Sequence, residues 1–234
     1  MDYTKQAFAT KVSSVDQGLR AYMVAVYNYM AVALAITGGV AFAVSSSPTL
    51  IQLLFGTPLQ WLVMFAPLIM VFFAVPKIAT LSLQGAQTVF WVFAAVMGVS
   101  LASIFLVYTG ESITRVFFIC AAMFGSVSLY GYTTKKDLTG LGTFMFMGLI
   151  GLIIASVVNI FLQSPMMYFI VSFIGVIIFT GLTAYDTQRI KDSYYHFSGS
   201  AEMAGKGAIY GALSLYMDFI NLFISLLRLF GDRR

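Results

Sequence analysis

The chain has 234 residues, of which 60% are hydrophobic and only 9% are charged. Soluble domains carry about 25% charged residues, so this composition excludes a soluble globular protein and predicts an integral, multi-pass membrane protein. The formal net charge of +4 comes from Lys and Arg in short polar stretches rather than in a basic stripe, so we expect no nucleic-acid partner. The single cysteine, Cys120, excludes an internal disulfide and a multi-cysteine metal site.

Apolar stretches of about 17–25 residues recur along the chain, and each is long enough to cross a hydrocarbon core about 30 Å thick. We expect helices because a lipid-exposed backbone must satisfy its own hydrogen bonds, and the alternation typical of barrel strands is absent. The seven predicted spans are 22–44, 59–75, 89–108, 116–132, 141–162, 166–185 and 208–230. The fold class is therefore all-α, with a cytoplasmic N-terminal tail over 1–21, one seven-helix transmembrane domain over 22–231 and a C-terminal tail over 232–234.

The positions of basic residues predict the orientation. The N-terminal stretch and the second, fourth and sixth connections all carry Lys or Arg, whereas the first, third and fifth connections hold only Arg115. The positive-inside rule then places the N-terminus in the cytoplasm. Seven spans would leave the basic C-terminal end, with Arg228, Arg233 and Arg234, outside. Either that tail is tolerated there or the last segment re-enters without crossing, and we favour seven full spans.

Two acids lie in the last two spans. Asp218 is near the middle of 208–230, where a lipid-facing carboxylate costs about 2.5–3.5 kcal/mol, so that side of the helix should face protein or water. Asp186 ends the sixth apolar span, which is compatible with helix to about Tyr195. Asp186 then lies about two and a half turns before the end of its helix. If the last helix begins near Gly207, Asp218 lies about three turns after its start. The pair is therefore predicted to share one depth.

Such a pair has a distinctive chemistry. Two carboxyls in a poorly hydrated site cannot both ionise cheaply, so their titrations couple: a shared proton holds the helices together, and a second charge separates them or requires a cation. Calcium prefers six to eight oxygens, of which two carboxylates supply at most four, so a calcium site here should be weak. Candidate ion-path or further ligand residues are Tyr185, Thr183, Thr187, Tyr216 and Asn221. A structural acid pair without ion flux is the alternative.

Three sequence stretches resemble the transmembrane Bax inhibitor motif family, particularly its bacterial members: SLYMDFINLFISLLRLFG (214–231), LYGYTTKKDLTGLG (129–142) and IGVIIFTGLTAYDTQ (174–188). The resemblance implies seven helices around a central last helix in a bacterial inner membrane. It also implies a pH-sensitive calcium leak gated by an aspartate pair, which falls on Asp186 and Asp218. The family's bacterial pore uses an arginine latch at the cytoplasmic end of the second helix. Here the only basic residue in that region is Lys77, which supplies charge but no bidentate clamp.

The competing functions are enzymatic and regulatory. Intramembrane aspartyl proteases share the Tyr185-Asp186 pair, but their second acid lies in Gly-x-Gly-Asp, whereas Met217 precedes Asp218 here, and their Pro-Ala-Leu element is missing. No phosphate-binding loop or nucleophile elbow is present. We therefore expect a calcium leak channel rather than an enzyme, with lipid, Ca²⁺ and H⁺ as partners and no resident cofactor. The alternative is a membrane regulatory protein that acts on a membrane-anchored AAA protease without ion flux. The resemblance implies this partner, because some bacterial members of the family associate with such a protease.

Overall fold

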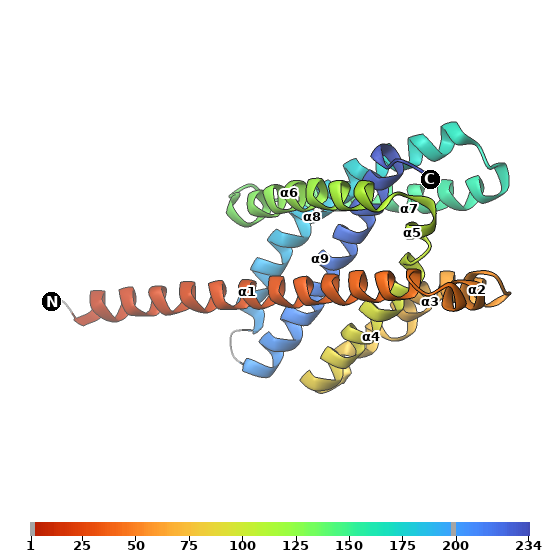
Figure 1. Cartoon of the computed structure of the whole chain (residues 1–234). Helices are drawn as coiled ribbons and strands as arrows, with labels where there is room; N and C mark the ends of the chain where they lie inside the picture. The colour runs from red at the N-terminus through yellow and green to blue at the C-terminus, as the bar shows by residue number, and fades with distance from the viewer. Residues whose placement is uncertain (1–2, 198–199) are drawn as a thin grey trace.

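The computed structural model describes residues 3–197 and 200–234, and in these ranges the chain forms helices joined by short turns (Figure 1). The predicted all-α class is confirmed. In chain order the elements are α1 (Tyr3–Ser45), α2 (Pro48–Phe55), α3 (Leu59–Phe73), the 3₁₀ helix η1 (Val75–Thr80), α4 (Leu83–Leu101), α5 (Ile104–Val107), α6 (Gly110–Thr133), α7 (Thr139–Leu162), α8 (Pro165–Phe197) and α9 (Ala201–Phe230).

Six described segments are long and apolar enough to cross a membrane: Gln17–Ser45 in α1, Leu83–Val107 through α4 and α5, and the helices α6, α7, α8 and α9. They correspond to all the predicted spans except the second. That one, 59–75, falls on α3, whose 15 residues measure only about 22 Å. The preceding α2 joins α3 at a bend of 81°, so the two helices form either a broken seventh span or a re-entrant loop.

Local chemistry explains the bend between α2 and α3. Ser47 caps α2 by accepting a hydrogen bond from the Leu50 backbone N–H at 3.4 Å, and Pro48 occupies the first turn, where its missing N–H is harmless. Gly56 ends α2, and Pro58 cannot donate the backbone hydrogen bond that would continue it. The apolar run is thus interrupted by backbone chemistry that hydropathy does not detect.

The first helix is longer than its predicted span. Residues 3–21, assigned to the tail, continue α1 as one helix, since this stretch contains no proline and only Gly18. The glycine allows close packing, because a Cβ at that position would meet the hydroxyl of Tyr194 near the end of α8. The part of α1 around Gly18 therefore lies beside the end of α8, and the N-terminal end of α1 extends beyond the other helices (Figure 1).

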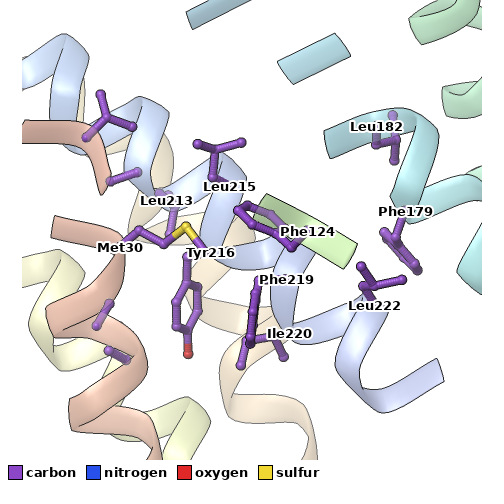
Figure 2. Packing of buried hydrophobic residues seen from close by; sticks show 14 of the residues in the cluster. Met30, Phe124, Phe179, Leu182, Leu213, Leu215, Tyr216, Phe219, Ile220 and Leu222 are labelled. Carbon is purple, nitrogen blue, oxygen red and sulfur yellow. The ribbon is translucent and has the colours of Figure 1, made fainter. Parts of the chain in front are cut away.

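The last helix is the centre of the bundle, as predicted. α9 packs against α1, α4, α6 and α8, and in Figure 1 it is seen between α1 and α6. In its apolar stretch 61% of the residues are buried, compared with 6% in α7. Figure 2 shows Tyr216 and Phe219 of α9 flanked by Met30 of α1 and Phe124 of α6.

The C-terminal end is tied to the opposite side of the bundle from the α8–α9 turn. Arg115 of α6 forms an ion pair with Asp232 at 2.7 Å, and the Asp232 backbone N–H donates to the Ser112 hydroxyl at 2.8 Å. Arg228 lies over the ring of Tyr168, near the start of α8. The 30-residue α9 is therefore unbroken and runs antiparallel along α8 rather than turning back.

Candidate functional site

The two transmembrane acids lie on α8 and α9, the most extensively packed pair of helices. Small residues allow this approach: a Cβ added at Gly211 would lie 3.0 Å from Ile190, and one added at Gly175 would lie 2.7 Å from the Ser225 hydroxyl. This antiparallel register brings Asp186 and Asp218 within range of electrostatic interaction with each other. Two residues on opposite sides of the α8–α9 turn thus contribute to one site.

The helix ends differ from the sequence expectation. α8 continues to Phe197 and α9 begins at Ala201 rather than near Gly207. Ser200 caps α9 by accepting from the Met203 N–H at 3.4 Å, and Lys206 pairs with Glu202 one turn away at 3.0 Å. Both acids are therefore further from the helix ends than predicted, and side-chain packing rather than equal distance from the ends brings them together.

Arg189 is a member of this site that sequence reasoning treated only as an orientation signal. Its Nη2 lies 3.3 Å from Asp186 Oδ1 and donates to the Ser214 hydroxyl of α9 at 3.3 Å. The guanidinium also lies 5.6 Å from the ring centroid of Tyr185. The available signal was its position three residues after Asp186, a spacing that brings side chains together on one helix face.

Asp218 is the buried end of the site. The residue is only 6% exposed, and its Oδ2 atom accepts no hydrogen bond. Among the described residues it is the one buried side-chain oxygen or nitrogen without such a partner. A buried carboxylate oxygen without a partner is strongly unfavourable, so it needs a proton, a water molecule or a cation.

Three of the predicted ligand residues use their polar groups along their own helices. Thr183 donates to the Phe179 carbonyl at 2.7 Å, Thr187 to the Thr183 carbonyl at 2.7 Å, and the Asn221 amide to the Met217 carbonyl at 2.8 Å. The Thr187 hydroxyl also lies 2.8 Å from that of Ser128 on α6. These groups satisfy the helix backbone rather than the acid pair.

The two predicted tyrosines contact other helices, and no hydrogen bond joins either hydroxyl to the acids in the described part of the chain. Tyr185 packs against α7, where a Cβ at Gly142 would meet its ring. Tyr216 is fully buried, and its hydroxyl lies 2.7 Å from that of Thr37 on α1. Thr37 in turn donates to the Ala94 carbonyl, so Tyr216 is the donor in this pair. Both rings support the helices that hold the acids.

The predicted latch residue, Lys77, is exposed on η1, and in the described part of the chain no ion pair involves it. The next residue, Ile78, is buried and lines a cavity of about 540 Å³ between the end of α8 and the start of α9. Arg189 and Ser214 line the same cavity, whereas neither acid does. Arg189 thus contacts both the cavity and Asp186, with Lys77 nearby on η1.

Among the side chains that the structure describes, which are those of residues 17–78, 80–197 and 200–234, no group of three or more His, Cys, Asp or Glu is placed to hold a metal ion. The acid pair is therefore the acidic cluster at membrane depth, and it offers four carboxylate oxygens at most. A divalent cation there would need water or backbone carbonyls to complete its coordination.

The sequence profile of the family described as "Inhibitor of apoptosis-promoting Bax1" matches residues 19–234, which include α1 from Leu19 onward, all the later helices and both acids. The chain belongs to the Bax inhibitor family. Among its relatives is an uncharacterized protein of Rickettsia prowazekii, 49% identical over 100% of this chain and 99% of its own. Another, from Caulobacter vibrioides, is 47% identical over 94% of this chain and 92% of its own. The inner membrane protein YbhL of Escherichia coli K12 is 44% identical over 93% of this chain and 94% of its own.

Membership of the Bax inhibitor family agrees with the resemblance seen in 129–142, 174–188 and 214–231. It accounts for a multi-span, all-α membrane protein whose similarity to its relatives extends over nearly the whole chain.

Proposed function

We propose that this Bax inhibitor family protein is a pH-sensitive leak channel for Ca²⁺, gated by Asp186 and Asp218. The observation that carries the proposal is the unpartnered, buried Oδ2 of Asp218 within electrostatic range of a second carboxyl. A proton shared by the two acids satisfies that oxygen in the closed state. When the proton leaves, two neighbouring charges in a poorly hydrated site require a cation. The proposed activity is transport, and no catalytic step is assigned.

Arg189 gives the gate a second part. Its guanidinium is permanently charged and pairs with Asp186, so it competes with Ca²⁺ for that carboxylate. Arg189 also lines the cavity at the α8–α9 turn. Permeation then requires the guanidinium to leave Asp186, and the half-exposed Arg189 has room to do so. Lys77 remains a candidate latch that would contribute charge from η1. With the hydroxyls of Thr187 and Tyr216 engaged elsewhere, water and backbone carbonyls are the remaining ligands.

The proposed location is a bacterial inner membrane with the N-terminus in the cytoplasm. The support is the similarity to an inner membrane protein of Escherichia coli and the charge pattern of the connections. In this orientation the α8–α9 turn, Lys77 and the start of α1 lie on the cytoplasmic side, and the clamped C-terminus lies outside.

The test is Ca²⁺ flux into liposomes containing the purified protein, measured from pH 5 to pH 8. Wild type should pass Ca²⁺ at a rate that depends on pH, and Asp186→Asn and Asp218→Asn should each flatten that dependence. Asp192→Asn is the matched control. Asp192 is an exposed acid on α8 that lines a small pocket with Arg189, but in the described part of the chain it forms no ion pair with that residue. Arg189→Gln should raise flux and leave a pH dependence.

A wild-type protein that passes no ions at any pH would contradict the channel. The regulatory alternative, action on a membrane-anchored AAA protease, would then be tested by measuring that protease's activity in cells with and without this protein. A flux that Asp192→Asn changes as strongly as Asp218→Asn would contradict the assignment of the gate to this pair.

A further inference from the structure

A lateral groove of about 850 Å³ separates α1 from α6, with Phe219 of α9 at its base. α1 packs against α4 and α9, and α6 packs against α8 and α9, so these two helices lie on either side of the central helix (Figure 1). Val24 and Leu129, which line the groove, are 50% and 62% exposed. The groove therefore opens onto the surface that faces lipid.

The middle of the groove has no hydroxyl free to donate to a polar ligand. The hydroxyl of Tyr27 lies 2.6 Å from that of Ser128, which lies 2.8 Å from that of Thr187. Because Thr187 donates to the Thr183 carbonyl, Ser128 donates to Thr187 and Tyr27 donates to Ser128. Each hydroxyl hydrogen of this Tyr27–Ser128–Thr187 chain is therefore donated within the protein. Apart from Arg20 and Tyr132, the other lining residues are apolar. An apolar chain is the occupant that such a wall favours.

The two ends of the groove differ in charge and depth. At one end is Arg20, which is exposed and forms no ion pair with any side chain that the structure describes; at the other is Leu34. Fourteen residues of helix separate them, or about 21 Å. One leaflet has nearly the same thickness, because half of a hydrocarbon core of about 30 Å plus one headgroup layer of about 5–7 Å comes to about 20–22 Å. The groove thus matches one leaflet, with Arg20 at the headgroups and Leu34 at the midplane.

We propose that this groove binds one anionic membrane phospholipid, with its phosphate at Arg20 and one acyl chain lying along the groove to Phe219. The charge of Arg20 selects the headgroup, and the apolar walls take the chain. Gly125 makes room on the α6 side, since a Cβ added there would meet nothing within 4 Å. The proposal concerns lipid binding and does not depend on ion flux.

Native mass spectrometry of the detergent-purified protein tests this proposal. Phosphatidylglycerol and phosphatidylcholine with identical acyl chains are titrated separately, and the fraction of protein that retains one lipid is measured. Wild type should retain phosphatidylglycerol at least fivefold better. Arg20→Ala should remove most of that preference, a loss of about fivefold, while Lys135→Ala, which removes an exposed charge outside the groove, should leave it unchanged.

The chain position is tested by Gly125→Leu, which fills the groove and should weaken retention of both lipids by a similar factor. Gly39→Leu is its control, because Gly39 also has open space around its Cβ position but lies outside the groove. Equal retention of both lipids by wild type, or an unchanged preference in Arg20→Ala, would overturn the proposal. Arg20 is exposed, so this variant is decisive even if Gly125→Leu fails to fold. Equal weakening by Gly39→Leu and Gly125→Leu would place the acyl chain elsewhere.

Discussion

The helices α7 and α9 differ in hydropathy and in burial, and the more apolar helix is the less buried one. α7 is the more apolar of the two, yet only 6% of its apolar stretch is buried, against 61% in α9. α9 carries Asp218, Asn221 and Ser225 and forms the centre. In water the more apolar helix would be buried, but lipid solvates apolar side chains as well as protein does. Polar groups and close packing therefore decide which helix is central.

The largest expected effect is a loss of stability when a buried aromatic ring of α9 is removed, compared with an exposed ring of α7. Tyr216→Ala on α9 removes a fully buried ring that packs edge-on against Phe90 and Phe93 and donates to Thr37. It should destabilise the protein by about 3–5 kcal/mol, as large buried aromatics do. Phe161→Ala on α7, where the ring is 82% exposed, should change stability by less than about 0.5 kcal/mol. Thermal unfolding in one detergent compares them, and equal losses would contradict the assignment of α9 as the core.

Two glycines on α6 sharpen the comparison, because one faces the core and the other faces lipid. A Cβ at Gly131 would meet the backbone carbonyl of Ala184 on α8, whereas one at Gly125 would meet nothing within 4 Å. Gly131→Ala should therefore lower stability by about 1–3 kcal/mol through overpacking. Gly125→Ala should be neutral or slightly stabilising, since alanine is the better helix former. Chemical unfolding of both variants measures the difference between their stabilities. Equal stabilities would contradict the close packing of α6 against α8 at Gly131.

The third prediction concerns the polar centre of α9. Asp218→Asn replaces a buried carboxyl that has an unpartnered oxygen with a neutral amide of similar shape. We expect stability near neutral pH to stay the same or rise by about 1 kcal/mol, because the charge no longer has to be buried. Unfolding at pH 7 measures this change. A large loss would mean that the acid is held for structure rather than for ion passage.

The smallest effect lies at the exposed start of α7. The side chain and backbone N–H of Thr139 hydrogen-bond to Asp137 and hold the pKa of its carboxyl below the usual value, with the backbone bond at 2.8 Å. Because this pKa is lowered by folding, the contribution to stability is present above the unfolded pKa and is lost as the pH falls through the folded pKa. Thr139→Ala should raise the pKa of Asp137 toward its ordinary value with little change in stability at pH 7. An NMR titration of this carboxyl measures the shift, and an unchanged pKa would contradict it.

The sequence by itself determined the membrane class, the helical state and the positions of the six long apolar segments. It did so because a hydrocarbon core demands about 20 apolar residues per crossing and a backbone that satisfies its own hydrogen bonds. It also identified Asp186 and Asp218, since an acid within an apolar span is conspicuous. It did not show that α2 and α3 form one bent apolar segment, because hydropathy records side chains and not backbone direction.

Only the tertiary structure decided which groups meet. It placed Arg189 against Asp186, turned the hydroxyls of Thr187 and Tyr216 toward other helices, and opened the groove between α1 and α6. Hydropathy alone would have favoured α7 as the central helix. Partners across helices depend on rotation and register, which are fixed by a few close contacts such as Gly211 with Ile190. Those contacts join residues from different helices, and no pattern within a single span specifies them.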